Sequence, residues 1–560
     1  MDTPQHRLDR TDYRALLRGA GGADSVAPLL AGERSWRLLL LRALAEATER
    51  LPCEPYPTLG HGWELLWRAW RTAPDEVESL LLYPAVGTWA AHALRRVRGS
   101  VTSEAPLWAD TSHLHAVAAS AAVLAGLDFE NRITALDGWA VLPGIGGARV
   151  ADSVVRVVAE AGVVRVGPVR VGGEGWHGLR ELRADGCVVT LDDLDPYRGL
   201  RGRLAPGPLD SAGRWADLFT EAWRILAADD PDSARAMATG LRTVVPRPRS
   251  EPYRPHSASS GDAFGAVVAS EPDDPEQLAC TLVHEFQHHK LSAFMHLFTL
   301  YDDGGTERFY APWRDDPRPL GGLLQGVYAF TGVTAFWARR PGLVAGFEYA
   351  LWRAQTLTAL DGVRDARRLT PVGRDLLREL TGRLTAGRDE PVDPRAADAA
   401  ALAAADHRAS WRAHHVRPSA AAVAEAARAC STAPGTRLVL PSDAGTVVPS
   451  PLPRGLDTRA VLLRRLLADD VPEALDSVEG ALPEDLALVT GDHRAARARF
   501  TERVLRGPDP DAWAGLGLAL RGQGHPAAGV LLSRPEFVSA VHARLGGDGD
   551  PVRLAEAFGG

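Results

Sequence analysis

The stretch PDDPEQLACTLVHEFQHHKLSAFMHLF, residues 272–298, decides how this chain is interpreted. Acidic residues occupy its first turn, and apolar residues then recur at helical spacing. Acidic side chains favour the positive end of the helix dipole, so the pattern predicts one long helix over 275–297. The apolar run AFGAVVAS, residues 263–270, comes just before it and predicts a strand.

The predicted helix carries His284-Glu285-Phe286-Gln287-His288, an HExxH motif. Residues four apart lie on one helix face, so both imidazoles can point at one metal ion with Glu285 beside them. A helix whose polar face merely includes two histidines is the alternative. The preceding strand and the neighbouring segments favour a metal site. For His289 and His296 we expect a surface or packing role rather than ligation.

A catalytic zinc or a non-haem iron usually has three protein ligands, so a third must come from elsewhere. The pattern HExxHxxGxxH is absent, because position 291 is Leu and position 294 is Phe. The next predicted helix, PLGGLLQGVYAFTGVTAFWARR (319–340), contains no acidic residue. Gln325 and Tyr328 are its best polar candidates for facing a site.

The segment between these helices, YDDGGTERFYAPWRDDPRPL (301–320), is rich in charged and aromatic residues. Arg314 and Arg318 are candidate anion clamps, since guanidinium binds carboxylate in a bidentate way. Tyr310 and Trp313 are candidate substrate contacts. A solvated loop is the alternative, but the combination favours the wall of a site. The carboxylates on offer are Asp302, Asp303, Glu307, Asp315 and Asp316.

Composition limits the class of protein. At roughly 100–200 residues per domain, 560 residues predict about three to four structural units. With 45% hydrophobic and 24% charged residues the chain is globular, and a net charge of −8 gives no general attraction to nucleic acid or anionic lipid. The cysteines lack CxxC spacing and the N-terminus lacks an apolar run. We therefore expect a cytoplasmic protein with no nucleic-acid partner and no membrane span.

Periodicity along the chain predicts a mainly α-helical fold with a small β component (α+β). Its parts are a helical N-terminal domain, a zincin-like core built on the HExxH helix, and a helical C-terminal region. In that last region, Trp513-x-x-Leu516-Gly517 resembles the opening of a tetratricopeptide-like helix pair. The predicted boundaries are 1–130 for the helical domain, 131–250 for a small sheet with helices, 251–390 for the core, and 391–560 for the C-terminal region.

Four runs of sequence together resemble a known family of actinobacterial HExxH-motif proteins. The family belongs to gene clusters for ribosomally made, modified peptides and is grouped as 2-oxoglutarate-dependent HExxH-type peptide β-hydroxylases. The similarity spans most of residues 100–345. The runs are LVHEFQHHKL (282–291), FYAPWRDDPRPLGGLLQGVYAF (309–330), HLHAVAASAAVLAGLDFE (113–130) and LDDLDPYRGL (191–200).

The resemblance implies iron(II) held by His284 and His288, 2-oxoglutarate as co-substrate, and oxidation of a precursor-peptide side chain. It also implies a histidine on the helix after PRPL, where this chain instead carries Gln325 and Phe330. Gln325 is therefore the candidate third ligand.

A cation is needed for the far carboxylate of 2-oxoglutarate. Arg314, Arg318 or Lys290, the single lysine of the chain, could supply it. On this interpretation Glu285 orients a ligand or an iron-bound water, because no hydrolytic base is required. Tyr310, Trp313 and Tyr328 are the candidate substrate contacts.

Two other functions stay open at this point. In a zinc metallopeptidase, His284 and His288 bind zinc and Glu285 is the general base that takes a proton from the metal-bound water. The HExxH motif alone favours that activity, whereas the missing third carboxylate argues against it. In a non-catalytic adaptor, the helical end regions bind a peptide or partner enzymes.

Overall fold

The computed structural model describes two compact units, Met1–Thr299 and Leu300–Gly560, each of which is considered by itself. The fold is mainly α-helical with a small β part, as predicted, with 57% of residues in helices and 12% in strands. The finer four-part division stays a prediction. The described residues are 6–49, 51, 56, 58–200, 202–386, 391–432, 437–442, 445–468, 475 and 477–558. Cys53 lies outside them, and no disulfide joins the cysteines within them.

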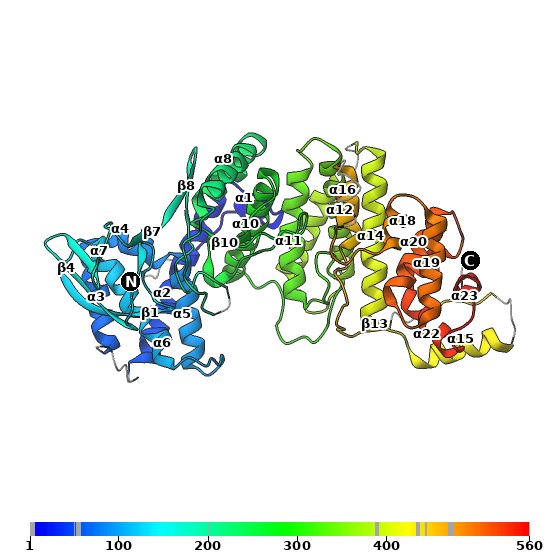
Figure 1. The fold of residues 1–560 in the computed structure, drawn as a ribbon, viewed down its shortest axis with the longest axis horizontal. Helices are drawn as coiled ribbons and strands as arrows, with labels where there is room; N and C mark the ends of the chain where they lie inside the picture. The colour runs from blue at the N-terminus through cyan, green and yellow to red at the C-terminus, as the bar shows by residue number, and fades with distance from the viewer. Residues whose placement is uncertain are drawn as a thin grey trace. The chain divides into compact units, whose positions relative to one another are not determined.

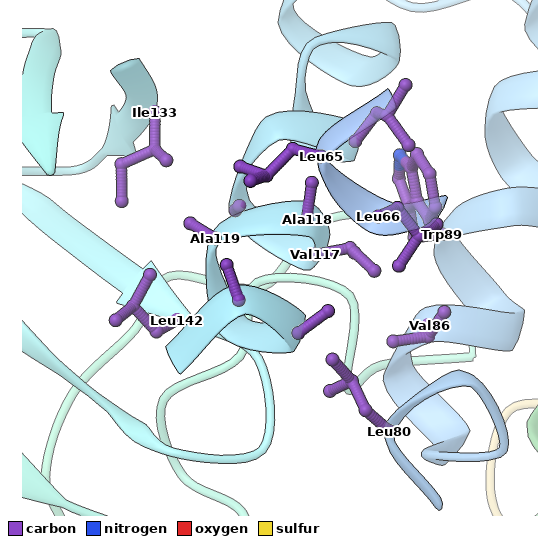
Figure 2. Close-up of a cluster of buried hydrophobic side chains, with 14 of the residues drawn as sticks. Leu65, Leu66, Leu80, Val86, Trp89, Val117, Ala118, Ala119, Ile133 and Leu142 are labelled. Carbon is purple, nitrogen blue, oxygen red and sulfur yellow. The ribbon is translucent and has the colours of Figure 1, made fainter. Parts of the chain in front are cut away.

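Among the described residues, the first unit opens with seven helices, which form its N-terminal part (Figure 1). They are α1 (Arg10–Leu17), α2 (Ala23–Thr48), α3 (Leu59–Thr72), α4 (Pro74–Leu81), α5 (Pro84–Val97), α6 (Leu107–Thr111) and α7 (His113–Leu124). Figure 2 shows side chains of α3, α5 and α7 directed toward one another, with Trp89 and Val117 fully buried among them. Ile133 and Leu142 of the following strands belong to the same core. Burial of this apolar surface is what holds the helices together.

A seven-stranded sheet follows, in the spatial order β6-β5-β4-β1-β2-β3-β7, with neighbouring strands antiparallel. Glycines at positive φ, such as Gly138, Gly144 and Gly162, separate several of the strands, because glycine adopts this conformation without steric cost. The strands are β1 (Phe129–Leu136), β2 (Trp139–Leu142), β3 (Gly146–Arg149), β4 (Val154–Glu160), β5 (Val163–Val166), β6 (Val169–Arg170) and β7 (Trp176–Gly178).

A second, five-stranded sheet has the order β11-β12-β10-β9-β8. Its three central strands are parallel, and the edge strands β8 and β11 are antiparallel to their neighbours. The strands are β8 (Arg180–Ala184), β9 (Cys187–Leu191), β10 (Thr243–Arg247), β11 (Ser257–Ala258) and β12 (Ala266–Ser270). Helices α8 (Ala212–Asp229) and α9 (Pro231–Gly240) connect β9 to β10, and the 3-10 helix η1 (Gly261–Ala263) precedes β12. The predicted strand before the HExxH helix is thus β12, which is confirmed.

The HExxH helix is α10 (Pro275–Leu297), with the predicted bounds. Asp274 caps its start by accepting a hydrogen bond from the backbone N–H of Gln277. The helix packs against α8 and α2, and most of its residues are buried. A helix fixed on several sides holds its motif residues in one orientation, as a metal site requires.

The second unit consists of helices and one small ribbon of two strands, β13 (Val416–Arg417) and β14 (Thr446–Val447). Helices α11, α12 and α14 lie side by side in its first half (Figure 1). The helices are α11 (Leu320–Trp337), α12 (Leu343–Gly362), α13 (Pro371–Ala386), α14 (Pro394–His415), α15 (Ala420–Thr432), α16 (Thr458–Leu467), α18 (Pro483–Val489), α19 (His493–Arg506), α20 (Pro510–Gly522), α21 (Ala528–Ser533), α22 (Pro535–Arg544) and α23 (Pro551–Phe558).

Trp513 of α20 is buried in the core that the C-terminal helices form. Within the described ranges, no helix combines the length and apolarity needed to cross a bilayer.

Candidate metal centre

The two motif histidines face each other on α10. The Nε2 atoms of His284 and His288 lie 3.1 Å apart, and the rings meet edge to face with centroids 4.8 Å apart. With metal–nitrogen bonds of about 2.0–2.1 Å, this separation corresponds to a ligand–metal–ligand angle of roughly 100°. That angle lies between octahedral and tetrahedral values. One divalent ion therefore fits between these nitrogens, and iron and zinc are both compatible with it.

The protonation state of His284 suits a metal. Burial lowers the pKa of His284 to about 4, so its imidazole is neutral at physiological pH. A neutral imidazole is the form that binds metal ions. The His284 side chain is still 20% exposed, which leaves the pair accessible from one side.

Glu285 lies beside the pair in a buried position. Its side chain is 1% exposed, and its Oε1 atom is 3.9 Å from His284 Nε2. The Ser257 hydroxyl donates a hydrogen bond of 2.6 Å to the same oxygen. Burial raises the pKa of Glu285, but the two imidazoles and the hydroxyls of Ser257 and Ser259 outweigh it, so the pKa stays below its usual value. The group is therefore a carboxylate.

The second carboxylate oxygen of Glu285 is buried and accepts no hydrogen bond from the described residues. An unpaired buried carboxylate oxygen is costly, so its presence calls for a donor. A water or hydroxide on a metal held by the adjacent histidines would be such a donor. The residues present thus fit a metal ion with a bound water.

Ser257 is a site residue that the sequence reasoning missed. It lies on β11, an edge strand of two residues, where it pairs with Ala269 of β12. The pairing carries the Ser257 hydroxyl to Glu285, 28 positions further along the chain. No local pattern marks this serine, because only the long-range strand pairing brings it to the motif.

The other polar residues of α10 have structural roles. His289 is buried and its Nε2 atom lies 2.8 Å from the Ala266 carbonyl oxygen of β12. His296 pairs with Glu33 of α2, with 2.6 Å between Nδ1 and Oε1. The packing role expected for both histidines is confirmed.

Lys290 is buried and donates hydrogen bonds to the carbonyls of Gly19 and Ala20, which follow α1. It lies two positions after His288, which places it about 200° further round the helix. The ammonium group is therefore directed away from the histidine pair. We leave Lys290 out of the proposed co-substrate site.

The second unit brings three of the predicted residues to one face of α11. The Arg318 guanidinium lies against Gly322, where a Cβ would be 3.1 Å from its Nε. Trp313 covers Gly326 so closely that a Cβ there would be 2.1 Å from the indole. Gln325, partly exposed, follows Gly322 by three residues, which places it about 60° from Gly322 round the helix.

The remaining candidates in this unit are more constrained. Arg314 and Arg318 both pair with the carboxylate of Asp316, at 2.8 and 3.2 Å. Tyr328 is 1% exposed, and burial raises its pKa well above the usual value. Tyr310 contacts His407 of α14, with 3.0 Å between its hydroxyl and Nδ1.

Asp315 of the 301–320 segment contacts residues far along the chain in the same unit. The Asp315 carboxylate accepts a hydrogen bond from the backbone N–H of Leu456, and its backbone carbonyl lies 2.8 Å from His415 Nε2. Across the residues that the structure describes, no cluster of three or more His, Cys, Asp or Glu side chains is placed to hold a metal ion. Gln325, which is none of these residue types, stays the predicted third ligand.

Comparison with known proteins does not assign a family. No protein-family model matches the chain, and a search of curated proteins finds no significant match. The class that the site itself defines is a protein with a two-histidine, HExxH-type candidate metal centre.

Proposed function

We propose that this chain is an iron(II)- and 2-oxoglutarate-dependent hydroxylase that acts on the β-carbon of a side chain in a ribosomally made precursor peptide. The observation that carries the proposal is the 3.1 Å separation of the His284 and His288 Nε2 atoms beside the buried Glu285 carboxylate. Imidazole binds iron(II) and zinc alike. The resemblance of four sequence runs to peptide β-hydroxylases supplies the choice of iron and of co-substrate.

In this proposal His284 and His288 hold the metal, and the Gln325 side-chain oxygen is the third ligand. With iron(II) and 2-oxoglutarate bound, the centre would supply the oxidising power that converts a C–H bond into C–OH. Arg318 is the preferred cation for the far carboxylate of the co-substrate, because it lies against the same α11 face as Gln325. Arg314, which shares Asp316 with it, is the second choice.

The aromatic residues have separate proposed roles. Trp313 packs on Phe330 with ring centroids 4.9 Å apart and so forms a rigid wall on α11. A rigid aromatic surface suits contact with a peptide side chain. Tyr328 is too deeply buried for direct contact, and we assign it a supporting position behind that wall.

Glu285 is a positioning residue in this proposal. Its Oε1 atom is held by Ser257, and Oε2 is left for a donor at the metal. A carboxylate fixed in this way orients a metal-bound water without having to remove a proton from it.

A zinc metallopeptidase is the second candidate. The observation in its favour is the 3.9 Å distance between Glu285 Oε1 and His284 Nε2, which keeps a general base close to the metal. Against it, Glu285 is 1% exposed and already accepts a hydrogen bond from Ser257. A general base for peptide hydrolysis has to reach the attacking water in an open cleft.

Metal analysis of protein purified without oxygen is the first test. We expect about one bound iron per chain, and loss of most of it in His284→Ala and His288→Ala, since each variant removes one of two facing ligands. His61→Ala, an exposed histidine of α3, is the matched control and should bind iron normally. Equal iron content in all three variants would contradict the proposed centre.

The second test separates the two activities. A precursor peptide encoded beside this gene is incubated with iron(II), oxygen and 2-oxoglutarate. Hydroxylation adds one oxygen atom to the peptide and converts one 2-oxoglutarate into succinate and carbon dioxide for each atom added. Glu285→Gln should keep a substantial fraction of this turnover, whereas a peptidase would lose nearly all activity. Peptide cleavage that needs no 2-oxoglutarate would establish the peptidase instead.

A further inference from the structure

A pocket of about 490 Å³ lies within the Leu300–Gly560 unit. The loop that carries Arg308 and Tyr310 forms one wall, and α14 forms another with Arg408 and Trp411. The C-terminal end of α12 and the β13–β14 ribbon complete it. The volume is in the range of sites for organic ligands of many atoms.

The walls of this pocket are held in place by specific contacts. Phe309 and Arg318 exchange two backbone hydrogen bonds, of 2.8 and 2.9 Å, which fix the loop before α11. The Tyr310 ring meets Trp411 edge to face with centroids 5.1 Å apart. The pocket is therefore formed before any ligand arrives, which reduces the entropic cost of binding.

Two arginines give the pocket a positive charge. Arg308 and Arg408 are exposed, and neither pairs with a carboxylate among the described residues. Arg308 donates to the backbone carbonyls of Thr306 and Glu307. The Arg408 guanidinium lies over the Tyr310 ring, 5.3 Å from its centroid.

The other charged groups at the pocket are already neutralised. Arg412 pairs with Glu536, and Asp361 pairs with Arg364 at 2.6 Å. The surplus at this place is thus two positive charges, in a chain whose net charge is −8. Because of this local positive charge, anionic ligands are attracted to the pocket, whereas the rest of the negatively charged protein does not attract them.

The aromatic wall adds a second feature. Trp411 is 3% exposed, and its indole N–H is buried without an acceptor among the described residues. A buried donor with no acceptor destabilises the free protein.

We propose that this pocket binds an acidic peptide segment. Acidic side chains of the segment pair with Arg308 and Arg408, while its apolar side chains pack against Phe309, Tyr310 and Val447, which line the pocket and are partly exposed. A free dicarboxylic acid would satisfy the charges but leave most of the apolar wall and most of the 490 Å³ unused. The assignment rests on the proposed function in one respect, namely that the segment belongs to the precursor peptide.

Fluorescence anisotropy tests the proposal with a short fluorescein-labelled peptide in which Asp and Leu alternate. The full chain is used with EDTA present, so the measurement does not depend on the metal centre. We expect binding that weakens with added salt, and roughly tenfold weaker binding for Arg308→Ala and for Arg408→Ala. Arg378→Ala is the matched control, because Arg378 is an exposed arginine of α13 paired with Asp375 outside the pocket.

Three results would overturn the proposal. They are equal affinity for a peptide with Asn in place of Asp, unchanged affinity in both pocket variants, and displacement of the peptide by succinate at a similar molar concentration. The last result would indicate a site for small acids.

The experiments distinguish failure of the proposed function from failure of the pocket assignment. Peptide binding that requires Arg408, together with no oxygen gain, would refute the hydroxylase alone. Oxygen gain in the wild type, with unchanged kinetics in both pocket variants, would refute the pocket assignment alone.

Discussion

Replacing Arg459 of α16 by methionine is expected to destabilise the Leu300–Gly560 unit by about 3–4 kcal/mol. The Arg459 side chain is 1% exposed and lies between two buried carboxylates, Asp406 of α14 and Asp485 of α18. Its Nε atom donates to Asp485 at 2.6 Å. Because Asp406 belongs to the same helix as Trp411, this ion pair also supports the wall of the pocket.

The expected loss of stability follows from the partners that each carboxylate keeps when Arg459 is replaced. Asp485 retains its ion pair with Arg454, whereas Asp406 keeps only the Ser410 hydroxyl, at 3.2 Å, among its hydrogen-bond donors in the described residues. Removing one partner of a buried ion pair costs about 3–5 kcal/mol, and the retained Arg454 places the expected value in the lower half of that range. At roughly 2–4 °C per kcal/mol, the melting temperature should fall by about 6–16 °C.

Scanning calorimetry and urea unfolding measure this loss. Arg506→Met is the control, since Arg506 and Glu502 form an exposed pair whose loss should change stability by no more than about 0.5 kcal/mol. A double variant, Arg459→Met with Asp406→Leu, should recover more than half of the lost stability, because no buried charge is then left unpaired. Burial raises the pKa of Asp406, so the deficit of the single variant should shrink as the pH is lowered. A single variant that loses less than about 1 kcal/mol, or a double variant without recovery, would refute the reasoning.

Three further predictions concern other parts of the chain. Burial opposes the ionisation of Asp511, but its hydrogen bond with His414 and the nearby arginines lower its pKa to about 2. The carboxylate should therefore contribute about 2 kcal/mol of folding stability above pH 4, and this contribution should be lost as the pH falls toward 2. Asp511→Asn should flatten the dependence of the unfolding free energy on pH, as measured by urea unfolding. Gly326→Ala should cost about 2–3 kcal/mol, since its Cβ would overlap the covering indole, whereas Gly382→Ala, with open space around it, should be neutral or stabilising in the same melting assay. Lys290→Met should speed proteolysis near α1 and cost about 1–3 kcal/mol, yet leave iron content unchanged; loss of iron would show that we have misplaced this lysine.

Local signals in the sequence were sufficient for the HExxH helix. The bounds of α10 agree with the prediction because a capping aspartate, a first-turn proline and apolar periodicity act over a few residues. The same holds for β12 and α11, whose existence follows from short apolar runs. These features need no knowledge of the rest of the chain.

The pairing of strands that are far apart in the chain could not be predicted from the sequence. Region 131–250 was predicted to hold one small sheet, but its strands divide between two sheets: β9 pairs with β10 of the second sheet, and β8 pairs with β9. Alternation of apolar residues identifies a strand without naming its partner. The same limit explains why Ser257 was missed.

The pattern of charged residues in the sequence did not identify which arginines lack a carboxylate partner. Arg314 and Arg318 were predicted as anion clamps from their type and spacing, yet both contact Asp316 between them. Arg308 and Arg408, the two pocket arginines without a carboxylate partner among the described residues, were not singled out, because they come together only when the 301–320 segment meets α14.

The support of Glu285 has a consequence for its motion. Its fixed oxygen depends on Ser257, an exposed residue on an edge strand of only two residues. So short a strand opens at far lower cost than the helix beneath it, because few backbone hydrogen bonds have to break. We therefore expect the hydrogen bond from Ser257 to Glu285 to open more readily than α10 unfolds, with the Ser259 hydroxyl as the remaining donor nearby.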